Sequence, residues 1–250
     1  MLPLNKNDMK KLLINYLPAL VAGSLILSSC GKPKSNVTGW KYNDEKNGGF
    51  EVIPYDEQIK TERFKQGERV RAYLVDVDDS GRGVFLRLSR SHPKFLGKLF
   101  ELEVPEIKAG TIEIKSIARE AGMRSKIAVW SKDSSVDPVG AMVGQRGSRV
   151  SVVMSELHGE RIDIIEYVED LAEYVERSLS PARVLGVDID EVNKTAHAVV
   201  TEDQQSLAIG KGGQNVRLAA KLTGWRIDIK SVPADQVAEY TDESDETDGE

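Results

Sequence analysis

A block of sequence in the middle of the chain recurs near its carboxyl end, and this duplication limits the possible folds more than any other feature. The segment Arg161-Ile162-Asp163-Ile164 returns as Arg226-Ile227-Asp228-Ile229, sixty-five residues later. Seven earlier positions repeat at an offset of sixty-six, pairing Asp137, Met142, Val143, Gly144, Gly147, Val150 and Val153 with Asp203, Ala208, Ile209, Gly210, Gly213, Val216 and Ala219. Solenoid repeats have periods of about 20–50 residues. The longer spacing predicts a small domain that is present twice.

Both copies show the same predicted order of elements, and that order defines an α+β fold. In the first copy, strands are expected at residues 111–117, 126–130 and 161–165 and helices at 136–143 and 166–179. After Gly147, a helix with one buried face is expected because Val150, Val153, Met154 and Leu157 stand at i, i+3, i+4 and i+7. The second copy is expected to have strands at 183–189, 195–200 and 225–229 and helices at 202–209 and 214–222.

Each copy contains a Gly-x-x-Gly loop between two predicted helices, Gly144-Gln145-Arg146-Gly147 and Gly210-Lys211-Gly212-Gly213. Because glycine has no Cβ, such a loop lets the main chain approach a sugar-phosphate backbone. The helix that follows directs free N–H groups and its positive dipole end to the same place. An ordinary helix–turn–helix corner, in which glycine only permits positive φ, is the alternative interpretation. The duplication of the loop, with a basic residue in each tip, favours phosphate binding.

This arrangement resembles the KH RNA-binding module, whose loop clamps about four nucleotides of backbone. The strand order is similar to the type II form. The segments 143–150 and 206–219, together with 100–107, resemble the bacterial NusA family of transcription elongation and termination factors, and the resemblance covers about residues 57–232. It implies a cytoplasmic factor that binds single-stranded nascent RNA and acts with RNA polymerase in pausing, termination and antitermination.

The residues expected to bind RNA are Gly144, Gln145, Arg146, Gly147, Ser148 and Arg149 in the first copy, and Gly210, Lys211, Gly212, Gly213, Gln214, Asn215 and Arg217 in the second. Contacts of this kind position the RNA backbone without reading its bases. Base contacts would come from an adjacent groove, which only the family resemblance suggests. Its apolar floor would be formed by Val143, Val150, Ile209 and Val216.

Upstream of the duplication, two alternating segments at 70–77 and 84–90 flank a run of turn residues and predict a β-hairpin. They resemble the last two strands of the OB-type barrel of ribosomal-protein-like RNA-binding modules, including the basic ending Leu88-Ser89-Arg90. Such a barrel needs five strands, and residues 1–66 supply no convincing first three. The sequence therefore predicts either a truncated barrel or a hairpin that packs on the next domain.

The first thirty residues resemble a secretory signal, because three lysines precede an apolar stretch from Leu12 to Leu27. This stretch is short for a spanning helix, which needs about 20 residues. The four residues ending at Cys30 resemble a bacterial lipobox, so the alternative function is an exported lipoprotein anchored in the cell envelope at Cys30. A buried helix beside an incidental cysteine is a second interpretation. A fusion over residues 1–53 is a third, since export and RNA binding belong to different compartments.

Charge and composition exclude several classes of function. Residues 233–250 carry eight acidic side chains and no basic one, so the net charge of −6 becomes +2 for residues 1–232. One cysteine and three scattered histidines do not supply a disulfide framework or a zinc site, and no cofactor is expected. The second loop lacks the spacing of a nucleotide-binding P-loop. The chain is therefore predicted to be a binding protein rather than an enzyme, with no small-molecule substrate. It is expected to act as a monomer.

The expected organisation is two tandem type II KH domains preceded by a partial OB-type hairpin and an N-terminal apolar helix. The six segments are a signal-like apolar segment at 1–30, a linker at 31–56, a partial OB-type barrel at 57–104, a first KH domain at 105–179, a second KH domain at 180–232 and a disordered acidic tail at 233–250. Because the NusA family begins with a polymerase-binding domain that the first 56 residues do not resemble, the expectation of RNA polymerase as a partner is weaker than that of RNA.

Overall fold

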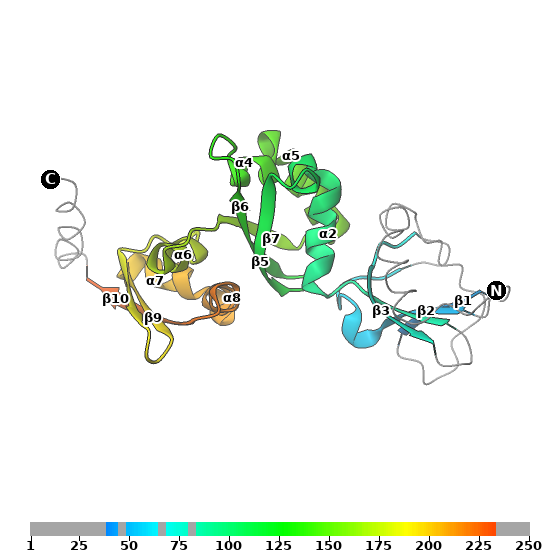
Figure 1. Ribbon diagram of the computed structural model, residues 1–250. Coiled ribbons are helices and arrows are strands. Elements are labelled where there is room, and N and C mark those ends of the chain that lie inside the picture. The colour runs from blue at the N-terminus through cyan, green and yellow to red at the C-terminus, as the bar shows by residue number, and fades with distance from the viewer. Residues whose placement is uncertain (1–38, 45–48, 65–68, 80–83, 234–250) are drawn as a thin grey trace. The chain divides into compact units, whose positions relative to one another are not determined.

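A computed structural model describes residues 39–44, 49–64, 69–79 and 84–233 of the 250-residue chain. The chain divides into two compact units, residues 1–98 and 99–250, whose elements are labelled in Figure 1. The predicted apolar helix, Cys30 and residues 234–250 lie outside the described residues. In the described ranges, no helix is long and apolar enough to cross a membrane.

The first unit contains a four-stranded sheet with the order β1-β2-β4-β3. Its elements are β1 (Gly39–Asp44), β2 (Gly49–Pro54), the short 3-10 turn η1 (Tyr55–Glu57), β3 (Tyr73–Asp79) and β4 (Val84–Ser89). The antiparallel β3–β4 pair is the hairpin that the sequence predicts. β1 and β2 form a second antiparallel hairpin, and β2 runs parallel to β4.

The prediction of a linker over residues 31–56 is therefore wrong for β1 and β2. Trp40 and Tyr42, and then Phe50 and Val52, alternate with other residues, which is the period of a strand. The Gly-, Asn- and Lys-rich composition around them obscured this signal. The hairpin at β3 and β4 thus gains a partner strand within its own unit.

Arg90, directly after β4, is buried in the first unit rather than presented at the surface. Its side chain is 1% exposed, and Nη2 and Nε donate to the two carboxylate oxygens of Glu62 at 2.6 and 2.7 Å. The rings of Phe64 and Phe95 lie beside the guanidinium, with centroids at 5.4 and 5.1 Å. A charge pair removed from water needs such complete hydrogen bonding. Arg90, the basic residue at the end of the predicted hairpin, therefore stabilises the interior of the first unit.

The first of two similar domains follows helices α2 (Pro93–Glu103) and α3 (Pro105–Lys108). Its elements are β5 (Ile112–Glu120), β6 (Arg124–Ser131), α4 (Pro138–Val143), the 3-10 turn η2 (Gln145–Gly147), α5 (Ser148–Glu156) and β7 (Arg161–Glu166). The central strand β6 is antiparallel to β5 and parallel to β7. Residues 125–129 of β6 are all buried, and helices α4 (Pro138–Val143) and α8 (Gln214–Thr223) contact this strand.

The second domain repeats this architecture. Its elements are α6 (Leu171–Ser178), β8 (Gly186–Asp190), β9 (Thr195–Thr201), α7 (Glu202–Ile209), the 3-10 turn η3 (Lys211–Gly213), α8 (Gln214–Thr223) and β10 (Arg226–Val232). The central strand β9 is antiparallel to β8 and parallel to β10. Ala196, Ala198 and Val200 alternate along β9 and are fully buried. Small side chains at these positions let the helices approach the sheet closely.

Helix α6 belongs to the core of the second domain. Val175 and Leu179 pack with Ala196, Ala219 and Ile227. The Asp170 side chain begins the helix by accepting a hydrogen bond from the Glu173 N–H at 2.8 Å. The structure thus differs from the sequence analysis, which ends the first domain after this helix at residue 179.

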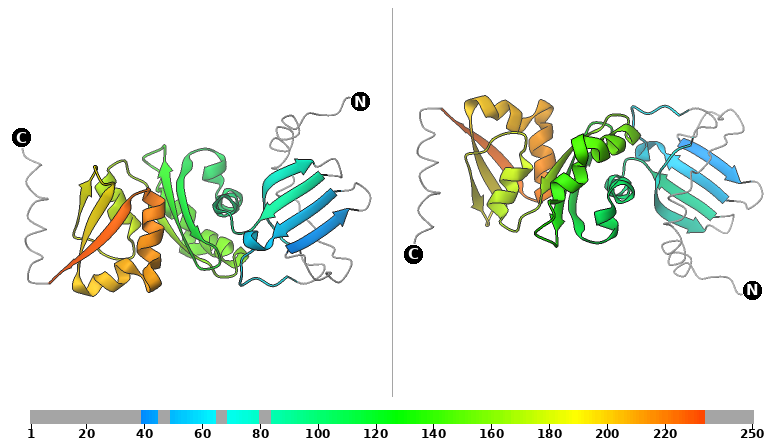
Figure 2. Two further views of the ribbon diagram at one scale, coloured as in Figure 1. Left: turned by 90° about the horizontal axis from the view of Figure 1, so that it is seen from below. Right: turned by 90° about the horizontal axis from the view of Figure 1, so that it is seen from above.

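The two domains of the second unit share a packed interface, in which α8 lies between the two three-stranded sheets (Figure 2). Leu218 and Leu222 of α8 pack in one cluster with Ala118, Ala128 and Ile165 of the first domain. Removing this apolar surface from water stabilises the pair, since each Å² of buried apolar area contributes about 25 cal/mol. The two Gly-x-x-Gly loops are therefore presented by one packed body.

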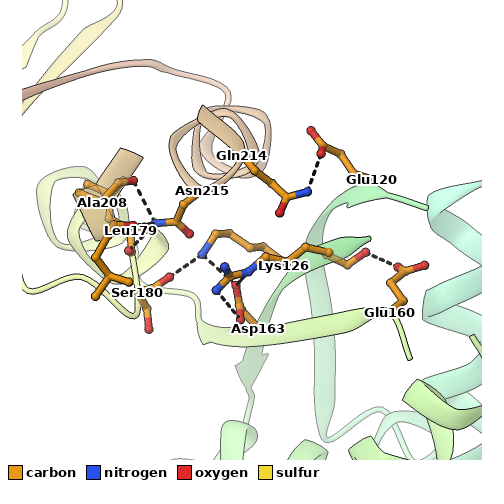
Figure 3. A network of polar contacts seen from close by, with 12 residues as sticks. Glu120, Lys126, Glu160, Asp163, Leu179, Ser180, Ala208, Gln214 and Asn215 are labelled. Atoms are coloured by element: carbon orange, nitrogen blue, oxygen red, sulfur yellow. Dashed lines mark hydrogen bonds and ion pairs between the residues drawn. The ribbon is translucent and has the colours of Figure 1, made fainter. Parts of the chain in front are cut away.

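Polar contacts reinforce this interface (Figure 3). The Lys126 side chain is fully buried, and Nζ donates to the Ser180 carbonyl at 2.6 Å and to Asp163 at 3.2 Å. Burial lowers the pKa of Lys126, although the neighbouring carboxylate opposes this effect. Ser116 Oγ donates to the Leu222 carbonyl at 2.9 Å. These bonds join residues far apart in the sequence and fix the register between the two domains.

Candidate nucleic-acid interface

The two loops have the same backbone conformation. Gly144 has φ 74° and ψ 171°, and Gly210 has φ 74° and ψ 170°. Gly147 and Gly213 both lie in the left-handed region, at φ 78° and 74°. At the third position of each loop, Arg146 has φ 52° and Gly212 has φ 60°. The duplication seen in the sequence is thus a duplication of local geometry.

The first glycine of each loop is required by packing inside the loop. A Cβ on Gly144 would lie 2.7 Å from Cγ of Arg149, and one on Gly210 would lie 2.8 Å from the backbone N of Asn215. The backbone region that both glycines occupy is also open almost exclusively to glycine. These two residues therefore shape the loop, whereas a Cβ on Gly212 would meet no atom within 4 Å.

We expect Gly210→Ala to lower the free energy of unfolding by about 3 kcal/mol, because it combines a clash with a forbidden backbone region. Gly212→Ala is the matched control. It is expected to cost about 1 kcal/mol, since only the left-handed backbone is strained and the space is open. Urea unfolding of the two variants measures the difference. Equal losses would contradict the division of roles between the two glycines.

The tips of both loops face open space. Gln145, Arg146, Lys211 and Gly212 are exposed, and α5 and α8 begin directly after the loops. The N-terminal end of a helix offers N–H donors and partial positive charge to an anion. In each loop this end therefore coincides with one exposed cation, Arg146 or Lys211.

Arg149 and Asn215, which occupy equivalent positions, both turn toward the body of their domains. Arg149 Nη1 donates to the Ala141 carbonyl at 2.6 Å and also contacts Glu106. Asn215 Nδ2 donates to the carbonyls of Leu179 and Ala208 at 2.8 and 3.1 Å, and its residue is 1% exposed (Figure 3). The Asn215 side chain is thus buried and already bonded within its own domain, so the prediction that Asn215 binds RNA gains no support from an exposed side chain.

Gln214 and Arg217 of α8 are joined to the first domain through Glu120, the last residue of β5. Gln214 Nε2 donates to Oε2 of Glu120 at 2.9 Å, and Arg217 Nε donates to Oε1 at 2.6 Å. The hydrogen bond from Arg217 has the largest effect on Glu120 and lowers its pKa below the ordinary value. The bond from Gln214 also lowers this pKa, whereas desolvation opposes both. The sequence analysis missed Glu120, because ninety-seven residues separate it from Arg217.

Apolar side chains accompany the second loop. Leu207 and Ile209 at the end of α7 are 43% and 36% exposed, and Val216 on α8 is half-buried. In the first domain, Val143 and Val150 are also half-buried. The predicted floor residues therefore remain partly accessible beside the loops. Across the described ranges, no group of three or more His, Cys, Asp or Glu side chains could hold a metal ion.

Two αββααβ domains with a Gly-x-x-Gly loop between the last two helices define the class of tandem KH-domain proteins. The family described as the NusA-like first KH domain matches residues 90–167, and the NusA-like second KH domain matches residues 171–237. The chain therefore carries the tandem KH pair of the NusA-like family. The resemblance inferred from the sequence is confirmed.

Curated relatives agree with this assignment. The chain is 53% identical over 180 residues to the transcription termination/antitermination protein NusA of Halalkalibacterium halodurans, covering 72% of this chain and 47% of that protein. It is 48% identical over 198 residues to NusA of Bacillus subtilis, covering 79% and 53%. NusA of Thermus thermophilus is 50% identical over 179 residues, covering 72% and 46%. The chain thus spans about half the length of the curated relatives that it matches.

Proposed function

We propose that the second unit binds single-stranded RNA through the main chain and the exposed cations of its two Gly-x-x-Gly loops. The observation that carries this proposal is the pair of loops with the same backbone conformation, each with an exposed tip and a basic residue, on one packed body. The RNA-contacting groups are the tip residues 144–148 and 210–213, with Arg217 beside the second tip. The role is binding rather than catalysis, with no cofactor, and the protein acts as a monomer.

The strand arrangement of the three sheets supports this proposal. In both domains the central strand is antiparallel to one neighbour and parallel to the other. This mixed sheet fits the type II KH form. The four-stranded sheet of the first unit fits an incomplete OB-type barrel, a fold that also binds single-stranded nucleic acid.

The names of the relatives suggest the process that this RNA binding serves. Relatives in three bacterial species are named transcription termination/antitermination proteins. We extend that role to this chain: a cytoplasmic factor that binds nascent RNA and acts with RNA polymerase. Fractionation and labelling with a fatty acid test this role. If the protein is missing from the soluble fraction and carries the label at Cys30, the lipoprotein alternative is supported instead.

Binding through phosphates makes the affinity depend on salt. If each loop contacts about four nucleotides, the slope of log affinity against log salt should lie between about −3 and −6, since each phosphate contributes about −0.7 for a single strand. Fluorescence anisotropy with a labelled single-stranded RNA between 50 and 300 mM salt measures this slope. A flat line would contradict the proposal.

Arg146 offers a test that separates RNA binding from folding. It has positive φ, which is uncommon outside glycine, at the position where the second loop has Gly212. Arg146→Gly should therefore leave the free energy of unfolding unchanged or raise it by up to about 1 kcal/mol. The same variant should bind RNA about three- to tenfold more weakly, because one phosphate contact is lost. Unchanged affinity would exclude Arg146 from the site.

A further inference from the structure

The second loop is held in shape by a residue of the other KH domain. Arg217 Nε contacts Glu120 of the first domain at 2.6 Å, and the same guanidinium donates through Nη1 to the carbonyl of Gly212 at 3.1 Å. Gly212 is the tip of the second loop. A continuous chain of bonds therefore runs from the carboxylate of β5 through Arg217 to the tip.

Glu120 is the more buried partner of this ion pair, whereas the Arg217 side chain is 47% exposed. The Glu120 side chain is 17% exposed, and both of its oxygens accept hydrogen bonds, Oε1 from Arg217 and Oε2 from Gln214. Figure 3 shows the bond from Gln214. Gln214 is the first residue of α8. Glu120 thus holds two positions on the first turn of the helix that follows the loop.

The first loop has no equivalent support from another domain among the described residues. The positions equivalent to Gln214 and Arg217, sixty-six residues earlier, are Ser148 and Ser151, and their side chains make no hydrogen bond in the described structure. The first loop is instead held within its own domain by the contact between Arg149 and Glu106. Only the second of the two described loops is therefore bonded, through Arg217, to a carboxylate of the neighbouring KH domain.

We propose that Glu120 is a positioning residue for RNA binding, through which the first KH domain sets the geometry of the second Gly-x-x-Gly loop. This inference rests on the proposed RNA-binding function. It adds that the second loop reaches its full affinity only when the first domain is docked against α8. Glu120 itself touches no RNA in this scheme and acts through Arg217.

The sign of the effect separates positioning from simple electrostatics. A carboxylate beside a phosphate site repels the phosphate, so removal of its charge alone would strengthen RNA binding. Loss of positioning has the opposite effect, because Arg217 and the loop tip become mobile and must be ordered when RNA binds. A weaker affinity after neutralisation of Glu120 therefore reports positioning.

The test measures the binding of a fluorescein-labelled, single-stranded RNA 12-mer of mixed sequence to the full chain. We expect Glu120→Gln to weaken binding about three- to tenfold. In an Arg217→Ala background, the further change to Glu120→Gln should alter the affinity less than about twofold, because the residue acts through Arg217. Glu113→Gln is the matched control: Glu113 also lies on β5, but its ion-pair partners are Lys115 and Lys132, neither of which belongs to α8.

Unchanged or tighter binding of Glu120→Gln would overturn the inference, as would a full additional loss in the Arg217→Ala background. Near-UV circular dichroism at the assay temperature verifies that each variant is folded. The variant with aspartate at both Lys211 and Gly212 is measured in the same assay. If it binds normally, the proposed function itself fails. If it loses binding while Glu120→Gln does not, only the positioning role fails.

Discussion

Replacement of Lys211 and Gly212 together by aspartate is expected to weaken the binding of single-stranded RNA by about 30- to 100-fold. The change removes one positive charge and places two negative charges at the exposed tip of the second loop, where phosphates would lie. An unfavourable change of about 2–3 kcal/mol corresponds to that factor. Folding should be preserved, because both residues are exposed and a Cβ on Gly212 meets no neighbouring atom.

A control variant with the same change in net charge at another position shows whether the loss of affinity depends on where the charge lies. Val192 and Lys194 lie in the exposed turn between β8 and β9, and Val192 is 92% exposed. This turn lies at the carboxyl end of α8, since the Arg226 N–H bonds the Lys194 carbonyl, whereas the loop lies at the start of α8. Aspartate at both positions changes the net charge by the same −3, because it also removes one positive charge and places two negative charges. Equal losses of affinity in the two double variants would show that the loop is not the site.

Asn215→Ala is expected to lower the free energy of unfolding by about 2–4 kcal/mol. Its buried amide donates to three carbonyls, those of Leu179, Leu207 and Ala208. The variant leaves these acceptors without that donor and creates a small cavity between α6, α7 and α8. The variant should therefore be less stable, but once folded it should bind RNA with an affinity within about threefold of that of the original protein.

Urea unfolding monitored by circular dichroism measures this loss, with Asn193→Ala as the control. Asn193 is exposed and its amide bonds Asp190 at 2.7 Å, so its loss should be about 1 kcal/mol or less. If Asn215→Ala were as stable as the original protein but bound RNA poorly, Asn215 would be a ligand-contacting residue, as the sequence alone suggested.

The features that could be predicted from the sequence are those encoded locally or repeated. The offset between Gly144 and Gly210 gave the duplication and the element order, and the structure confirms two domains with matching loops. The β3–β4 hairpin was predicted from alternation and turn residues within one short segment. Such signals depend on a residue and its near neighbours in the chain.

The features that sequence reasoning missed depend on tertiary contacts. Whether an arginine meets solvent or a buried carboxylate is decided by distant segments, as for Arg90 with Glu62 and Arg217 with Glu120. The assignment of α6 could have been improved, because residues 171–174 stand sixty-six residues after α3, which precedes the first sheet. The repeat itself therefore pointed to a leading helix in the second domain.

The most direct test of RNA binding by the two loops is an amide NMR titration of the isotopically labelled chain with a single-stranded RNA 12-mer. We expect the largest shifts and line broadening at residues 144–149 and 210–217, with both sets responding over the same concentration range because one packed body presents them. Changes confined to other surfaces, with the amides of both loops unmoved at saturation, would contradict RNA binding by the two loops.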